Sequence, residues 1–394
     1  MARCFPLLSL ALSALLCAGF ATAQDALPSA PASLPKVASP TPPAPPAAPQ
    51  AEQPPPPAPP ATPPPPETPP PTSDERDPVP ARDEKPLPEV DEASRQAAEP
   101  PPPPTAPTGP DIHDDRSGFI GLVRAQVLMD RAWVSPGEID GRTGTNTTRA
   151  IGGFQRLSGL PVTGHLDEAT WQALEKHGPA LVRYTLTEAD VKGPFRAIPG
   201  SMYGKAKLPA LSYSNIGEAL GEKFHIRPAA LAELNPGKAF TAGTEIIVPN
   251  VLDIAALPQA TRIVVSEAAK LLMLINPDGK VYAQFPVTTG SERDPLPIGE
   301  WELRSVAKNP HYNYNPKLFK GAKPGPLATL PPGPNSPVGV MWMGLSKPHY
   351  GIHGTPEPGS ISKTHSNGCI RMTNWSVLQV SNAVARGTPV TLIP

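Results

Sequence analysis

The sequence predicts a multidomain protein in which a mostly-β domain follows a small three-helix bundle and an α+β module, with a disordered proline-rich segment ahead of all three. Three observations over the 394 residues predict this arrangement. More than half of the 61 prolines lie between residues 28 and 110, where large apolar residues are few, so that stretch cannot bury a core. Apolar residues at helical spacing begin near residue 115, and strand patterns begin at residue 261.

The amino terminus has the pattern of a secretory signal peptide. A short charged start precedes an apolar run from Phe5 to Phe20, and Ala21-Thr22-Ala23 provides the small residues of a cleavage site. The run is short for a transmembrane helix, and a retained anchor is the alternative. We therefore expect residues 1–23 to be removed and the protein to be exported to the periplasm or cell envelope. Removal would leave Cys369 as the one remaining cysteine of three.

Residues 24–114 are expected to form a disordered, proline-rich tether. Proline runs favour an extended polyproline II chain of roughly 3 Å per residue. Such a tether lets a folded body search an extended polymer, and the alternative is a spacer without a ligand. The formal net charge of −1 gives no case for nucleic acid or an anionic membrane as a partner.

Residues 115–180 are expected to form the three-helix bundle. The first helix has an apolar face, the second begins near Thr145, and Asp167 is the expected N-cap of the third. The residues expected on the apolar faces are Ile120, Val123, Val127, Ala150, Phe154, Leu157, Trp171 and Leu174.

The α+β module is expected over residues 181–252, and the mostly-β domain over residues 258–394. The module has the predicted order strand, helix, helix, strand, over Tyr184–Leu186, Ile216–Phe224, Pro228–Leu234 and Glu245–Val248. The final domain, of about 130 residues, is large enough for its own core. Its predicted strands are Arg262–Ser266, Lys270–Asn276, Val281–Thr288 and Glu300–Val306, the second and third joined by a turn at Pro277-Asp278-Gly279-Lys280.

Cys369 is the candidate nucleophile. A free thiol is only slightly ionised at neutral pH, so a catalytic cysteine needs a neighbouring base to take its proton. His353 is the favoured base, because it follows an apparent strand and is expected at the end of that strand, facing a cleft. His365, four residues before the cysteine, is the alternative base, or else a loop or binding residue.

A nucleophile that attacks a carbonyl also needs hydrogen-bond donors for the oxyanion that forms. Gly368 permits a tight turn, so the backbone N–H groups of Asn367, Gly368 and Cys369 are the candidate donors. No metal is expected, because His353, His365 and Cys369 lack a standard zinc spacing. No cofactor is expected either.

The two N-terminal modules carry resemblances to cell-wall modules. The stretch from Ala125-Gln126 through Ile139-Asp140-Gly141 and Phe154-Gln155 to Thr170-Trp171 resembles the helical peptidoglycan-binding repeat of cell-wall enzymes. Leu234-Asn235-Pro236, Gly243-Thr244 and Ile247-Val248-Pro249 resemble a LysM-type module, although the spacer after its first strand is longer than usual for that family. The LysM-like module is therefore expected either to bind glycan or to serve as a structural linker.

The C-terminal motifs resemble the signature of the YkuD family of L,D-transpeptidases. They are Ile352-His353-Gly354-Thr355 and Ser366-Asn367-Gly368-Cys369-Ile370-Arg371-Met372, supported by Thr288-Thr289-Gly290, Pro295-Leu296-Pro297-Ile298-Gly299, Asn309-Pro310 and residues 330–339. Together they span residues 261–394 in order. Many members carry His immediately before the Gly-Cys pair, where this chain has Asn367; we expect that change to affect the donor-binding surface more than activation of the thiol.

This resemblance implies acyl transfer on peptidoglycan stem peptides. Cys369 would attack the carbonyl of the third residue of a tetrapeptide donor, D-Ala would leave, and His353 would assist the proton transfers. Transfer to an amine gives a 3→3 crosslink, water as acceptor makes a carboxypeptidase, and a lipoprotein lysine makes an anchoring enzyme. The rivals are a non-catalytic wall-binding scaffold and, more remotely, a general cysteine protease.

Several further residues are candidate substrate-binding groups. Arg371 is expected to bind a substrate carboxylate or, equally, to form a structural salt bridge. Ser366 is expected to shape the loop, and Gly354 and Thr355 to orient His353, with a strand-cap hydroxyl the alternative for Thr355. Trp342 and Tyr350 are expected either to line the cleft or to pack in the core. The Pro- and Gly-rich stretch from Asn309 to Gly339 is expected to cover the cleft as a lid.

Overall fold

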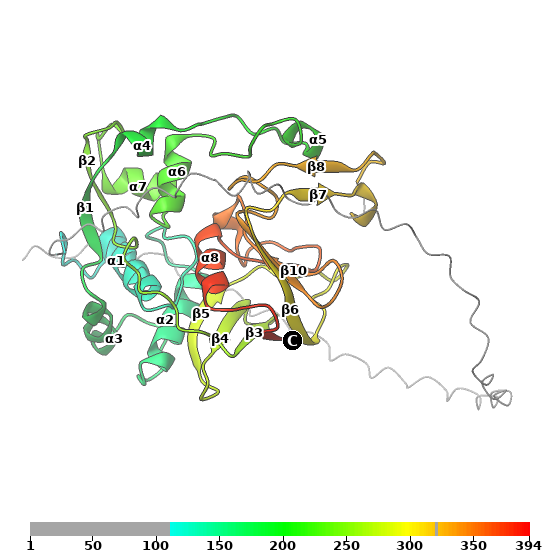
Figure 1. The fold of residues 1–394 in the computed structure, drawn as a ribbon. Coiled ribbons are helices and arrows are strands. Elements are labelled where there is room, and N and C mark those ends of the chain that lie inside the picture. Colours follow the sequence, from blue (N-terminus) through cyan, green and yellow to red (C-terminus); the bar gives the residue numbers. More distant parts are fainter. Residues whose placement is uncertain (1–110, 320–321) are drawn as a thin grey trace, which may run out of the picture. The chain divides into compact units, whose positions relative to one another are not determined.

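The computed structural model describes residues 111–319 and 322–394 (Figure 1). The predicted signal peptide and almost all of the predicted tether therefore lie outside the described residues. None of the helices in the described ranges is long and apolar enough to cross a membrane.

The three predicted helices of the first module are present as α1 (Gly118–Arg131), α2 (Thr145–Leu157) and α3 (Glu168–Leu174), followed by the 3₁₀ turn η2 (Glu175–His177). The Asp167 side chain accepts a hydrogen bond from the Thr170 backbone N–H, as expected of an N-cap. Phe154, Trp171 and Leu174 are buried in the core of the bundle.

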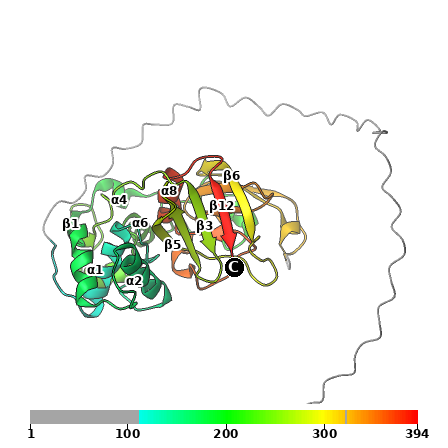
Figure 2. The same ribbon diagram turned by 90° about the horizontal axis from the view of Figure 1, so that it is seen from below.

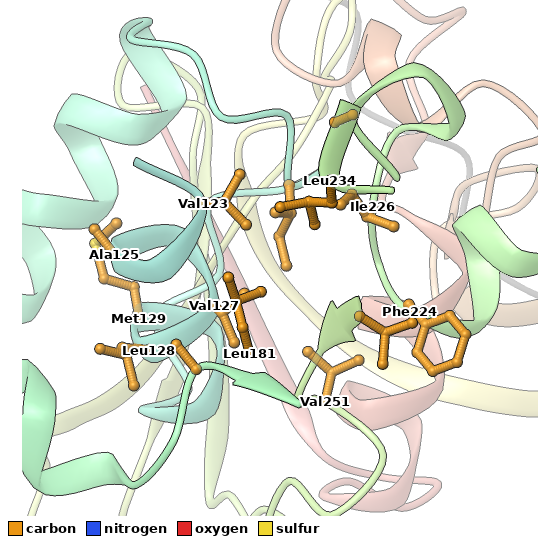
Figure 3. Packing of buried hydrophobic residues seen from close by; sticks show 14 of the residues in the cluster. Val123, Ala125, Val127, Leu128, Met129, Leu181, Phe224, Ile226, Leu234 and Val251 are labelled. Atoms are coloured by element: carbon orange, nitrogen blue, oxygen red, sulfur yellow. The ribbon is translucent and has the colours of Figure 1, made fainter. Parts of the chain in front are cut away.

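The next module has the predicted strand–helix–helix–strand order. Strand β1 (Leu181–Thr185) pairs antiparallel with β2 (Glu245–Pro249), and α6 (Ile216–Lys223) and α7 (Pro228–Leu234) lie between them in the chain. The long spacer after β1 contains two short helices, α4 (Glu188–Lys192) and α5 (Met202–Lys205). One hydrophobic cluster joins this module to the helical bundle, with residues of α1, β1 and α7 side by side in Figure 3.

The third part is a curled, mostly-β domain. Its eight strands are ordered β11-β10-β9-β6-β12-β3-β4-β5, and β12 and β3 at its centre run parallel (Figure 2). Thr288, just beyond β5, pairs with Arg371 on β11, so the two edges of the sheet meet. The strands are β3 (Arg262–Ser266), β4 (Leu271–Ile275), β5 (Val281–Pro286), β6 (Gly299–Lys308), β9 (Met341–Leu345), β10 (Gly351–His353), β11 (Ile370–Arg371) and β12 (Pro389–Ile393).

Several elements of this domain were not predicted, among them strands β9, β11 and β12, helix α8 (Asn374–Asn382) and the hairpin within the expected lid. Helix α8 begins at the N-cap Thr373 and buries Val377 and Val380 in the domain core. The expected lid contains a hairpin of β7 (Tyr312–Tyr314) and β8 (Ala328–Leu330), with the 3₁₀ turn η3 (Pro316–Leu318) between them. A further turn, η4 (Pro358–Ser360), lies between β10 and β11.

The helical bundle adds to the outer edge of the sheet. The loop after α1 pairs with strand β5, because the Ser135 N–H donates to the Gln284 carbonyl at 2.9 Å and the Gln284 N–H donates to the Trp133 carbonyl at 3.0 Å. The buried Gln284 side chain also donates to the Arg149 carbonyl at 3.2 Å. Exposed strand edges invite unwanted pairing, and this docking covers one.

Candidate active site

Cys369 lies at the end of a tightly held loop. The Ser366 N–H donates to the Thr289 carbonyl at 2.9 Å, and the Ser366 hydroxyl donates to the Cys369 carbonyl at 2.5 Å. Gly368 has φ of +95°, and a Cβ atom there would lie 2.6 Å from Cε1 of Tyr350. The loop therefore requires glycine at this position for both its conformation and its contact with Tyr350.

The parallel pairing of β10 with β11 brings together the two segments that carry His353 and Cys369. His353 is the last residue of β10 and lies opposite Arg371, and Cys369 immediately precedes β11. Segments sixteen residues apart in sequence are thus joined through strand pairing.

His353 is held in one orientation from two sides. Its Nδ1 lies 2.7 Å from the Gly354 carbonyl, so Nδ1 carries the proton and donates it, and Nε2 keeps its lone pair. Its ring stacks on Trp342, with centroids 5.4 Å apart and an interplanar angle of 21°. Burial, reinforced by the charge of Arg371, lowers the pKa of His353 to about 4, so the imidazole is neutral at pH 7.

The thiol is also neutral at rest. Burial raises the pKa of Cys369, and a hydrogen bond from the Gly351 backbone and the positive charge of Arg371 offset only part of that effect. The thiol donates to the His349 carbonyl over 3.7 Å. In the resting state the thiol and the imidazole are therefore both neutral and do not form a thiolate–imidazolium pair.

Two more side chains surround the thiol. The guanidinium of Arg371 acts electrostatically on both Cys369 and His353, and no carboxylate in residues 111–319 or 322–394 pairs with it. The structural salt bridge considered for Arg371 is thus not formed among these residues. Tyr312 of β7 lies close enough to Cys369 for the two to interact; burial first, then Cys369, raises the pKa of Tyr312 to about 12.

Tyr312 was anticipated only as part of the lid segment and not as a site residue. Tyr312 pairs with Leu330, and the Pro- and Gly-rich chain of residues 313–329 between them has no local pattern that would place the Tyr312 side chain at the thiol. The proximity of Tyr312 to Cys369 follows only from the folded β7–β8 hairpin.

The remaining predicted residues have identifiable positions. The Gly354 carbonyl orients His353, and a Cβ at Gly354 would lie 2.2 Å from Oδ1 of Asn374. The Thr355 hydroxyl accepts from the Glu357 N–H at 3.2 Å, the cap role considered for it. His365 is exposed, and its Nδ1 lies 3.2 Å from the Gly290 carbonyl.

The aromatic candidates contact the site directly. Trp342 lies against Gly351 and stacks on His353, whereas Tyr350 contacts Gly368 and also packs against the domain core; both are half-buried. Within the described ranges, the backbone N–H groups of Asn367, Gly368 and Cys369 donate to no protein acceptor. A cavity of about 470 Å³ lies elsewhere, in the α+β module, lined by Phe195, Tyr213 and Lys223 among others.

Comparison with known families gives two matches along the chain. Residues 260–392 match the L,D-transpeptidase catalytic domain family YkuD, and residues 125–174 match the family described as "Putative peptidoglycan binding domain". The chain is 34% identical over 176 residues to the Bacillus subtilis protein named "Putative L,D-transpeptidase YkuD", covering 44% of this chain and 91% of that protein. A Bacillus licheniformis protein of the same name is 32% identical over 180 residues, covering 45% of this chain and 93% of that protein.

Among solved structures, the L,D-transpeptidase of Xylanimonas cellulosilytica (residues 123–326) aligns with a TM-score of 0.32 at 16% identity, covering 73% of this chain and 99% of that one. The family identification depends on the sequence matches, which cover nearly the whole length of the Bacillus proteins. Together with the match over residues 260–392, they show that the chain belongs to the YkuD family of L,D-transpeptidases, cysteine-dependent acyltransferases that act on peptidoglycan.

Proposed function

We propose that Cys369 is the nucleophile of this L,D-transpeptidase and His353 its base. The observation that carries the proposal is the pairing of β10, which ends at His353, with β11, which begins directly after Cys369, together with the unprotonated Nε2 of His353. Cys369 attacks the carbonyl of the third stem residue of a tetrapeptide donor. The S–C bond forms as the thiol proton passes to Nε2, and the C–N bond to D-Ala then breaks as that proton passes to the leaving amine.

The proton moves during the attack rather than before it. Both partners are neutral at rest, because burial raises the pKa of the thiol and lowers that of the imidazole. A bound donor expels the remaining water and brings its own carbonyl to the sulfur. Proton transfer and S–C bond formation are then coupled, which limits attack by the thiol on other electrophiles.

We assign the hydrogen bonds that stabilise the oxyanion in each step to the loop that ends at Cys369. The N–H groups of Asn367, Gly368 and Cys369 have no acceptor among the described residues, and Gly368 at φ +95° turns the backbone at this point. Donors of this kind are worth about 10²–10³ in rate. Arg371, without a carboxylate partner in the described chain, is assigned to a carboxylate of the donor peptide.

The second half of the reaction passes the acyl group from Cys369 to an acceptor. An amine of a second stem peptide gives a 3→3 crosslink, with His353 taking the amine proton as the thiolate leaves and returning it to sulfur. Water gives an L,D-carboxypeptidase and a lipoprotein lysine gives protein anchoring by the same thioester. The acceptor therefore decides among these products.

The test uses the purified full-length chain with disaccharide-tetrapeptide. Crosslinked dimers seen by mass spectrometry support transfer, whereas tripeptide alone supports hydrolysis. Incubation with a carbapenem should add its mass to wild type and not to Cys369→Ser. If wild type forms neither product nor adduct, the assignment of Cys369 is wrong, and a wall-binding scaffold becomes the better reading.

We also propose that the accessory modules bind the wall. The peptidoglycan-binding match over residues 125–174 supports residues 115–180 as a wall-binding domain, and the β1–α6–α7–β2 order supports residues 181–252 as LysM-like. Export through a signal peptide at residues 1–23 and a tether over residues 24–114 complete the proposal. Cosedimentation of the full chain with purified sacculi tests it; a chain that stays in the supernatant would leave the two modules as structural linkers.

A further inference from the structure

We propose that Tyr203, in the long spacer of the α+β module, is a positioning residue for the donor side of the reaction. The inference concerns residues 196–213, which we call the strap, and it builds on the proposed function of Cys369. The strap lies in the spacer between β1 and α6, which is longer than the spacer of a LysM-type module. Its contacts with the mostly-β domain suggest a role for these additional residues.

The base of the strap is fixed to the mostly-β domain. The Arg196 N–H donates to the Tyr213 carbonyl at 3.1 Å, which closes the strap on itself. The fully buried Leu211 then donates its N–H to the Pro332 carbonyl at 2.9 Å, and its own carbonyl accepts from the Asn335 N–H at 3.0 Å. These bonds attach the strap to residues 332–335, the segment that follows β8.

The far end of the strap reaches the β7–β8 hairpin, where α5 lies beside β8 (Figure 1). The Tyr203 ring packs edge-on against Tyr314 of β7, with centroids 5.9 Å apart and an interplanar angle of 78°. The Tyr203 hydroxyl donates to the Pro326 carbonyl at 3.1 Å, next to β8. One side chain thus contacts both arms of the hairpin.

The hairpin connects this contact to the thiol. Tyr314 and Tyr312 are two residues apart on β7, and Tyr312 interacts with Cys369 and Arg371 at the site. A two-stranded hairpin is at best marginally stable by itself in water, and this one pairs over only three residues a side. It therefore needs a support from outside, and Tyr203 provides one.

The consequence falls on donor binding more than on the chemical step. Loss of the Tyr203 contact allows the hairpin to leave its docked position, and with it Tyr312, without moving His353 or the loop at Cys369. An aromatic pair is worth about 0.5–1.5 kcal/mol, so the docked population falls about two- to tenfold at most. The KM for the donor should rise by a similar factor while kcat changes less.

The experiment compares full-length wild type, Tyr203→Ala and Tyr203→Phe on disaccharide-tetrapeptide. Tyr203→Ala should raise KM about two- to tenfold, and Tyr203→Phe, which keeps the ring, should restore most of the loss. Alkylation of Cys369 by iodoacetamide, which needs no donor site, should be no slower than in wild type in either variant. These three results together support the proposal.

Tyr282→Ala is the matched control. Tyr282 also packs edge-on against an aromatic ring, Trp133 at 6.2 Å, and its hydroxyl also donates to a proline carbonyl, that of Pro258. It should lower the melting temperature without raising KM. An unchanged KM in an active, folded Tyr203→Ala protein overturns the inference, as does an equal rise in Tyr282→Ala. Inactive wild type would instead count against the proposed function of Cys369.

Discussion

At the scale of single residues, the site combines a buried imidazole with a half-buried thiol, and both groups are uncharged at neutral pH. His353 sits between Trp342 and the Gly354 carbonyl, which fixes its tautomer. Because its pKa falls to about 4 while that of Cys369 rises, the ion pair seen in many cysteine enzymes is not the ground state here. Reactivity should therefore depend on the bound donor.

The pH profile of alkylation tests this directly. The thiolate is the species that reacts, and a raised pKa keeps its fraction small up to and above about pH 8.5. The rate of iodoacetamide labelling of Cys369 should therefore rise about tenfold per pH unit from pH 6 to 8, with no plateau. A rate that is flat between pH 5 and 8 would show a preformed thiolate and contradict the neutral pair.

Gly368→Ala should separate backbone strain from damage to the site. The new Cβ meets positive φ and also Tyr350 at 2.6 Å, whereas Gly387, at φ +89°, has open space around it. Both alanine variants should lose about 1–3 kcal/mol of stability from strain. Activity per folded molecule should fall about 100-fold in Gly368→Ala alone, because a shift of about 1 Å at the nucleophile is costly. Equal activity losses in the two variants would refute a special role for Gly368.

At the scale of elements, the helices and strands that could be predicted from the sequence are those marked by a short local pattern, such as a turn motif or an apolar face. The β4–β5 hairpin has a Pro-Asp-Gly-Lys turn between two strands rich in apolar residues, and the second helix was expected to begin near Thr145, where α2 begins. Helix α8 was missed because Asn374, Trp375 and Ser376 are buried together with its valines, so it shows no single apolar stripe. The pairing of β7 with β8 was not predicted because the two short strands are separated by residues 315–327, so no tight turn marks a hairpin.

The same distinction applies to the site. Cys369 and His353 carry recognisable motifs, but the fifteen residues between them give no information about the distance in the fold. Parallel pairing of β10 with β11 brings their segments together, and the register of a short strand cannot be read from its sequence. Tyr203 and Tyr312 come from other parts of the chain and have no motif of their own.

The contact between α6 and α8 gives a prediction about pH and stability. Asn374 donates to Glu222 at 2.9 Å, and burial, with Glu218 and Glu138 nearby, raises the pKa of Glu222 to about 8. The folded state then binds a proton that the unfolded chain releases, so Glu222 should reduce stability as pH rises from about 4.5 to 8. Glu222→Gln should flatten this part of the melting-temperature profile.

Glu233→Gln is the matched control for Glu222→Gln. Glu233 forms an exposed ion pair with Arg142, so Glu233→Gln should leave the slope of melting temperature against pH as in wild type. If Glu222→Gln keeps the wild-type slope as well, the pH dependence arises elsewhere. Because Oδ1 of Asn374 also lies against Gly354, this contact joins the α+β module to the strand end that carries His353.

At the scale of the whole described chain, the accessory modules and the mostly-β domain are in direct contact at several points. The bundle pairs with β5, α6 contacts α8, and the strap supports the lid hairpin. The two N-terminal modules share one hydrophobic core, and the mostly-β domain has a separate core. We therefore expect these contacts to couple the unfolding of the modules within residues 111–394, because opening one module breaks bonds made by the next.

Two adjacent glycines of α2 test this coupling. In Gly152→Ala the new Cβ meets only Val162 at 3.5 Å, an ordinary contact, so the gain in helix propensity should stabilise the protein by about 0.5–1 kcal/mol. In Gly153→Ala it meets the buried Gln284 amide at 2.2 Å, which is held by the Arg149 carbonyl. That variant should instead melt at a lower temperature and show a separate, earlier transition by calorimetry as the bundle leaves β5. If both alanines stabilise the protein equally, Gln284 moves aside at no cost, and docking at the sheet edge does not couple the bundle to the catalytic domain.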